Sequence, residues 1–234
     1  MKNSFLLVPV VFLLIIGMSC GQSGSVKSVD LKSKADSAGY AIGILVGTNN
    51  KQQIENAPGG DQINLEAMAA AFRAVAMGEE AKMTVEQADS VIRVFFEGEG
   101  EKQGQKNLEE GNAFLENNKT REGVQTTPSG LQYEVIQEGN GPKPAADDQV
   151  RVHYEGTLTD GTVFDSSIER GQPAVFGVNQ VIPGWTEALQ LMSVGSKWKI
   201  YVPSDLAYGP RGAGADIGPN SVLIFEVELL EIVE

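Results

Sequence analysis

Apolar residues recur at helical spacing in the first half of the chain. Asn64 can cap the start of a helix, and Gly78 can end one, because glycine adopts the left-handed backbone of a helix terminus. The apolar positions between these two residues lie about one turn apart: Leu65, Met68, Phe72 and Val75. This periodicity predicts an amphipathic helix between Asn64 and Gly78.

A second helix start follows at Thr84 and Gln87, which form a capping-box pattern. The positions after it make a single apolar stripe: Ala88, Val91, Ile92, Phe95 and Phe96. An earlier stretch, 40–46, is apolar but contains Gly43, and regularly spaced glycines let helices approach closely. We expect a helical region over about 33–122 whose own core is small, so that pairing with a second copy is the economical way to bury its apolar side chains.

The end of this region is rich in glycine. Gly98, Gly100, Gly104 and Gly111 interrupt it, and each weakens a helix by roughly 1 kcal/mol relative to alanine. We therefore expect a hinge near 98–104 rather than one long rigid helix.

The remaining chain, from about Val124, alternates strand-like and turn-like segments. The pattern predicts strands around 131–135 and over 150–158, 197–202 and 222–232, and a short helix over 184–192. The apolar residues of that helix lie on one face: Trp185, Ala188, Leu189 and Met192. Strands clustered around one helix indicate an α+β domain.

The first twenty residues read as a targeting signal. Lys2 precedes an apolar run that is too short to span a bilayer as a helix. Small residues then lead to Cys20, which is typical of a lipoprotein signal whose cysteine becomes the acylated first residue. We expect a signal over 1–19 and a flexible tether over 20–33, with ordinary secretion as the alternative.

Composition narrows the chemistry. The net charge of −13 argues against nucleic acid as a partner. The single cysteine excludes an internal disulfide, and the single histidine, His153, makes a multi-histidine metal site or a Ser-His-Asp triad implausible. We interpret His153 as structural, because it should face away from its neighbour Tyr154.

Three blocks occur in order: VRVHYEGTLTDGTVFDSS, VIPGWTEALQLMSVG, and the stretch from AYG through IGPN to VLIFEVELL. Together they resemble an FKBP-type peptidyl-prolyl cis/trans isomerase, whose fold is an antiparallel sheet wrapped around a short helix. A signal, a helical domain, a connecting helix and a C-terminal FKBP domain resemble the dimeric macrophage-infectivity-potentiator and FkpA type. The resemblance implies a helical dimerisation domain over 34–97, a connector over 98–123 and an isomerase domain over 124–234. The alternative is that 33–96 folds alone as a three-helix cap.

The resemblance also implies the site. Residues with a catalytic role would be Asp165, Tyr208, Phe164 and Tyr154. Residues that bind substrate would be Trp185 as the floor, Val181, Ile182, Phe225, Ile217 and Arg170. The Ile182 N–H and the Tyr208 hydroxyl would donate hydrogen bonds to the peptide, and Arg170 would pair with Asp165. Taken singly, Phe225 and Val181 would be read as core residues, so it is the ordered set of motifs that carries the assignment. Ala174, where better-known members carry an aromatic residue, is expected to open one side of the pocket.

This chemistry requires no cofactor and no metal, and the partners would be proline-containing unfolded or exported polypeptides. The expected location is the periplasmic side of a Gram-negative envelope, with contact to the outer membrane through the lipid on Cys20. Two functions are compatible with these features. One is an isomerase that assists the folding of exported proteins, and the other is a dimeric holdase chaperone with incidental isomerase activity.

Overall fold

The computed structural model describes residues 29–233 of the 234-residue chain. The predicted signal, the tether up to residue 28 and Cys20 lie outside the described residues. Within the described part, no helix is long and apolar enough to cross a membrane. The chain divides into two compact units between Gly47 and Thr48, inside the first helix.

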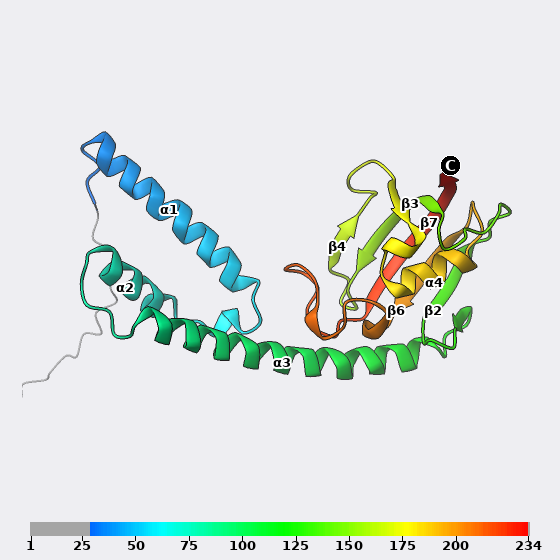
Figure 1. Cartoon of the computed structure of the whole chain (residues 1–234), viewed down its shortest axis with the longest axis horizontal. Helices are drawn as coiled ribbons and strands as arrows, with labels where there is room; N and C mark the ends of the chain where they lie inside the picture. Colours follow the sequence, from blue (N-terminus) through cyan, green and yellow to red (C-terminus); the bar gives the residue numbers. More distant parts are fainter. Residues whose placement is uncertain (1–28, 234) are drawn as a thin grey trace, which may run out of the picture. The chain divides into compact units, whose positions relative to one another are not determined.

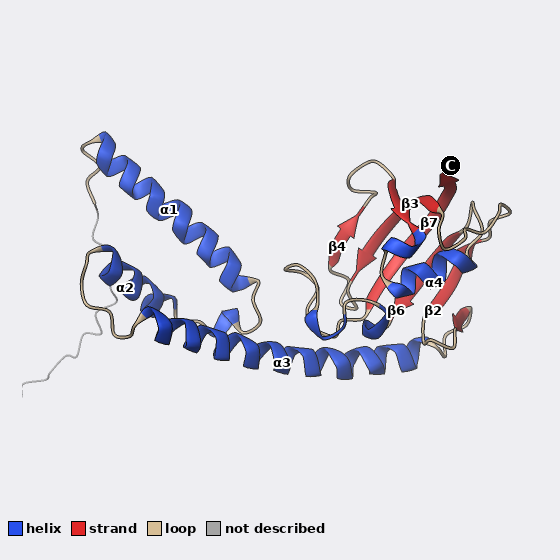
Figure 2. Cartoon of the chain, viewed as in Figure 1, coloured by secondary structure: helices blue, strands red, loops and turns tan. Residues whose placement is uncertain are grey.

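The N-terminal region is helical, as predicted (Figures 1 and 2). It contains α1 (Lys34–Glu55), the 3-10 turn η1 (Gly60–Gln62), α2 (Leu65–Ala76) and α3 (Val85–Asn118). Asn64 caps α2 through its side chain, and Gly78 follows the helix with a φ of 70°. Thr84 and Gln87 form the predicted capping box at the start of α3. Local sequence signals thus set these boundaries.

Most apolar side chains of α1 and α2 are exposed. Neither helix contains a buried residue, and Leu45, Phe72 and Val75 are each more than half exposed. The same holds for the start of α3, where Val91 and Ile92 are exposed. The hydrophobic periodicity predicted α2 and the start of α3 correctly, but the apolar residues named here are not buried.

The predicted hinge near 98–104 is wrong, because α3 is one continuous helix from Val85 to Asn118. Two of its glycines face the C-terminal domain. A Cβ added to Gly104 would lie 3.1 Å from the Cβ of Pro219, and one added to Gly111 would lie 2.7 Å from Cγ2 of Val222. These glycines allow the helix to approach the domain closely, and the packing gained there compensates for their weak helix propensity.

The C-terminal domain is a seven-stranded antiparallel sheet with the order β1-β2-β6-β7-β3-β4, and β5 also pairs with β3. Its strands are β1 (Val124–Thr126), β2 (Gln132–Gln137), β3 (Gln149–Thr157), β4 (Val163–Ser166), β5 (Ala174–Gly177), β6 (Lys197–Val202) and β7 (Leu223–Val233). The strands expected around 131–135 and over 150–158, 197–202 and 222–232 are confirmed, whereas the short β1, β4 and β5 had no separate prediction.

The short helix α4 (Pro183–Leu191) lies against one face of this sheet (Figure 1). Trp185, Ala188 and Leu189 are buried, as is Met192 just after the helix, and they join one core with the inward residues of β3, β6 and β7. The predicted α+β domain, a sheet wrapped around a short helix, is therefore present.

Candidate active site

An aromatic cleft of about 400 Å³ opens where α4 begins. The β3, β4, β5 and β7 strands contribute its walls, and the segment leading into α4 completes it. Its lining residues are Tyr154, Phe164, Asp165, Phe176, Gln180, Val181, Ile182, Trp185, Tyr208 and Phe225. Eight of these ten residues are predicted site residues, whereas Phe176 and Gln180 had not been predicted.

Trp185 lies at the centre of the aromatic cluster. Its ring makes edge-to-face contacts with Tyr154, Phe176 and Phe225, at centroid distances of 5.3, 5.8 and 5.2 Å. Phe164 in turn contacts Phe225 edge-to-face at 5.5 Å. Such arrangements hold each ring in one orientation, so the cleft is preformed and apolar.

The sequence builds this cleft by alternation along β3. Val150, Val152 and Tyr154 point into the core, and Gly156 is the next residue in the alternation. A Cβ at Gly156 would lie 2.6 Å from the Phe164 ring, and it would also approach the Phe225 ring within 2.9 Å. The absence of a side chain therefore creates the room in which both rings sit. Sequence reasoning missed Gly156, although a glycine at an inward strand position was the available signal.

Asp165 is held by two donors. The Tyr154 hydroxyl donates to one carboxylate oxygen, and Arg170 donates to the other. Arg170 also donates to the Tyr154 hydroxyl oxygen at 2.9 Å, which closes a triangle of polar groups at the rim of the cleft. The predicted pairing of Arg170 with Asp165 is thus present, and Arg170 acts behind the cleft lining rather than in it.

The same triangle determines the ionisation of the site. Partial burial acts to raise the pKa of Asp165, but the hydrogen bonds from Tyr154 and Arg170 outweigh it, so that the pKa lies below its ordinary value. Burial and the neighbouring Asp165 carboxylate raise the pKa of Tyr154. At neutral pH the cleft therefore presents a carboxylate and a neutral phenol.

Two donors in the cleft remain available. Ile182 is the N-cap of α4, and within residues 29–233 its N–H donates to no protein acceptor. Pro183 occupies the first turn, where its missing N–H removes no helical hydrogen bond. Tyr208 is 43% exposed, and its hydroxyl has no hydrogen-bond partner among the described residues.

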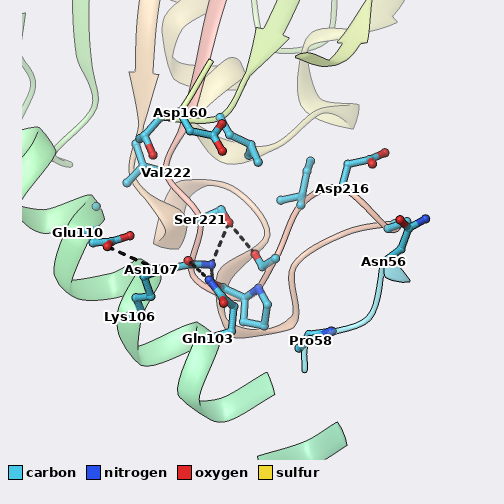
Figure 3. A pocket seen from close by; sticks show the side chains of 18 of the residues that line it. Asn56, Pro58, Gln103, Lys106, Asn107, Glu110, Asp160, Asp216, Ser221 and Val222 are labelled. Atoms are coloured by element: carbon cyan, nitrogen blue, oxygen red, sulfur yellow. Dashed lines mark hydrogen bonds and ion pairs between the residues drawn. The ribbon is translucent and has the colours of Figure 1, made fainter. Parts of the chain in front are cut away.

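Besides Arg170, Ile217 is the other predicted site residue that does not line the cleft. It packs against the core and lines a different cavity of about 600 Å³. That cavity lies between α3 and the loop before β7 (Figure 3). Ala174 does not leave its side of the cleft without an aromatic residue, because Phe176 follows two positions later on the same strand and packs on Tyr154 and Trp185.

Comparison with known proteins identifies the family. Residues 141–230 match the family model described as FKBP-type peptidyl-prolyl cis-trans isomerase, and residues 35–135 match the domain amino-terminal to such isomerases. The chain belongs to the FKBP-type peptidyl-prolyl cis-trans isomerases. Its sheet and α4 form the FKBP domain, and the helical region precedes it as in other members with both domains.

Relatives match over most of their length. The outer membrane protein MIP of Legionella longbeachae is 44% identical, over 88% of this chain and 88% of its own. The FKBP-type 22 kDa peptidyl-prolyl cis-trans isomerase of Escherichia coli is 48% identical, over 83% of this chain and 94% of its own. The crystal structure of FkpA from Escherichia coli matches with a TM-score of 0.62 at 32% identity, and it covers 87% of this chain and 98% of that one. This FKBP-type isomerase thus shares both its domains with these proteins.

Proposed function

We propose that the aromatic cleft isomerises X–Pro bonds of unfolded polypeptides by removing water from the amide and stabilising its twisted form. Rotation about an amide has a barrier of about 18–20 kcal/mol, because the C–N bond has partial double-bond character. The charge-separated resonance form that maintains this bond is stabilised by water. The observation that carries the proposal is a preformed apolar cleft with three rings packed edge-on around Trp185.

The residue roles follow from this geometry. Trp185 forms the floor under the proline ring, and Phe164 and Phe225 form walls around it. The Ile182 N–H and the Tyr208 hydroxyl donate to the carbonyl groups of the bound peptide, which strengthens binding of the twisted state. The chemistry needs neither a nucleophile nor a metal, since no covalent bond is broken.

Asp165 orients the rim of the cleft through Tyr154 and Arg170, and its charge interacts with the rotating carbonyl. The test is cis-to-trans isomerisation of a short X–Pro peptide, followed by a coupled protease, with Phe164→Ala and Asp165→Ala variants. We expect kcat/KM to fall at least tenfold in both, and to stay unchanged in Asp147→Ala, which removes an exposed carboxylate outside the cleft. Full activity in both cleft variants would reject these roles.

We also propose that the region 34–97 makes a homodimer, with 98–123 as the connection to the isomerase domain over 124–234. The support is the exposed apolar side chains of α1 and α2. Light scattering should give twice the mass of one chain. Phe72→Glu should lower that mass, whereas Glu66→Lys on the same helix should not. A monomeric wild-type protein would favour the cap of three helices instead.

A holdase chaperone is the second candidate function, favoured by the same exposed apolar faces. A dimer with two clefts could hold unfolded chains without isomerising them. The two functions separate in Asp165→Ala: suppression of aggregation that survives the loss of isomerase activity indicates a holding function of its own. Loss of both activities together would assign holding to the cleft.

For the location, we propose export and lipid attachment at Cys20. The support is the signal-like sequence before this cysteine and the relative named an outer membrane protein. Labelling of cells with a radioactive fatty acid should mark the wild-type protein and not Cys20→Ser. Labelling of neither protein would leave ordinary secretion.

A further inference from the structure

The loop that carries Tyr208 is hydrogen-bonded to helix α3 before it enters β7. After Tyr208 the chain passes through the 3-10 turn η4 (Gly209–Arg211) and returns to β7 through residues 218–222. The side-chain amide of Asn107, on α3, donates to the Pro219 carbonyl at 2.8 Å and lies 3.4 Å from the Ser221 hydroxyl. Figure 3 shows Asn107 and Ser221 facing each other beside the large cavity.

A second side-chain amide donates in the opposite direction, from the loop to α3. Nδ2 of Asn220, in the loop, donates to the Gly104 carbonyl of α3 at 3.1 Å. Gly104 has no side chain, and a Cβ there would lie 3.1 Å from Pro219, so the two segments meet at close range. Asn107 and Asn220 thus form a reciprocal amide clasp, each donating to a backbone carbonyl of the other segment.

The backbone of Asn220 connects the clasp with the cleft. Its N–H donates to the Gly209 carbonyl at 2.8 Å, and Gly209 directly follows Tyr208. Asn220 has a φ of 56°, and within residues 29–233 it is the sole residue other than glycine with a positive φ. Asparagine tolerates this left-handed backbone better than most residues. Residues with such backbone conformations cluster at functional sites.

We infer that Asn220 is a positioning residue that holds Tyr208 in place, with α3 as its anchor. The inference rests on the proposed role of Tyr208 as a donor to the substrate. The Tyr208 hydroxyl has no partner of its own, so the position of the side chain depends on the backbone that carries it. That backbone is fixed at Gly209 by Asn220, and Asn220 is fixed by the Gly104 carbonyl. The helical region would thereby support catalysis through a contact outside the cleft.

A simpler interpretation is that Asn220 serves the turn alone. Two substitutions separate the interpretations. Asn220→Gly keeps the positive φ and the N–H to Gly209, and removes the contact with α3. Asn220→Asp keeps the size and tolerates the backbone, but its carboxylate cannot donate to the Gly104 carbonyl. Asn112→Asp is the matched control, because Asn112 is an exposed asparagine of α3 and no side-chain hydrogen bond joins it to the loop.

The first readout is hydrogen exchange of the backbone amides of residues 207–209, 211 and 212 in the full chain, because Pro210 has no N–H. Loss of one hydrogen bond should speed their exchange by about threefold to tenfold in both Asn220 variants, and not in Asn112→Asp. Exchange that is unchanged in both Asn220 variants would overturn the inference.

The second readout is kcat/KM for an X–Pro peptide, with tyrosine or phenylalanine at position 208. Asn220→Asp should lower kcat/KM about threefold to tenfold with Tyr208 present, and should have no further effect in Tyr208→Phe. Equal losses in the two backgrounds would show a general structural effect and overturn the inference. If Tyr208→Phe alone is fully active, the proposed role of Tyr208 fails. Hydrogen exchange then decides by itself whether Asn220 anchors the loop.

Discussion

Adding one methyl group at Gly156 should damage the cleft more than the fold. The new Cβ of Gly156→Ala would lie 2.6 Å from the Phe164 ring and 2.9 Å from the Phe225 ring. Carbon atoms in contact prefer about 3.5–4.0 Å, so each ring must move by roughly 1 Å. Overpacking of this kind lowers the free energy of unfolding by about 1–3 kcal/mol.

The effect on catalysis should be larger than this loss of stability suggests. Phe164 and Phe225 are the walls that surround the proline ring in the proposed mechanism, and a displacement of roughly 1 Å at a reacting centre can lower a rate about a hundredfold. We expect kcat/KM for an X–Pro peptide to fall between about tenfold and a hundredfold. The assay runs under conditions in which urea unfolding shows the variant to be fully folded.

The matched control is Gly141→Ala. Its Cβ would lie 2.7 Å from the Cβ of Val194, which is an equally close contact away from the cleft. This variant should lose similar stability and keep its kcat/KM. A Gly156→Ala enzyme as active as Gly141→Ala would refute the argument that the glycine makes room for the walls.

Three further predictions follow from the same contacts. Although burial raises it, the hydrogen bonds from Tyr154 and Arg170 hold the pKa of Asp165 below its ordinary value. The stability that its charge provides should therefore persist above the unfolded-state pKa and disappear as the pH falls through the lower folded-state pKa, and urea unfolding of Asp165→Asn should lack this step. Gly111→Ala should lower the free energy of unfolding by about 1–3 kcal/mol in thermal unfolding, because α3 packs closely on the C-terminal domain there. Gly98→Ala should raise it by up to about 1 kcal/mol, because open space surrounds Gly98 and alanine favours a helix. Asn118→Ala should lower the free energy of unfolding by about 1–3 kcal/mol in urea, because the amide oxygen of the buried Gln132 loses the Asn118 donor at 2.8 Å.

Local signals predicted the secondary structure well. The Asn64 cap, the Thr84 capping box and the strand over 197–202 are all found at the expected residues. These features depend on the few residues next to them, so the sequence contains the information directly. Short strands such as β5 had no such signal, because their pairing partner, β3, is distant in the sequence.

Prediction from the sequence failed where the role of a residue depends on a contact with a residue far away in the chain. The glycines of α3 suggested a flexible hinge near 98–104 because of their weak helix propensity, but Gly104 and Gly111 allow the helix to pack on the loop before β7. Gly156 and Phe176 were missed for the same reason, because their effect depends on rings that come from other strands. Ile217 was assigned to the cleft and lies in the neighbouring cavity.

The sequence by itself determined the helical region, four of the strands with the short helix, the family, and most of the aromatic residues of the cleft, because periodicity, capping and ordered motifs are properties of the chain. The tertiary structure decided which atoms meet. Three features show this: the triangle of Asp165, Tyr154 and Arg170, the room that Gly156 leaves for two rings, and the amide clasp. Each depends on distances between residues of different segments. Such contacts follow from packing at close range, which no local pattern specifies.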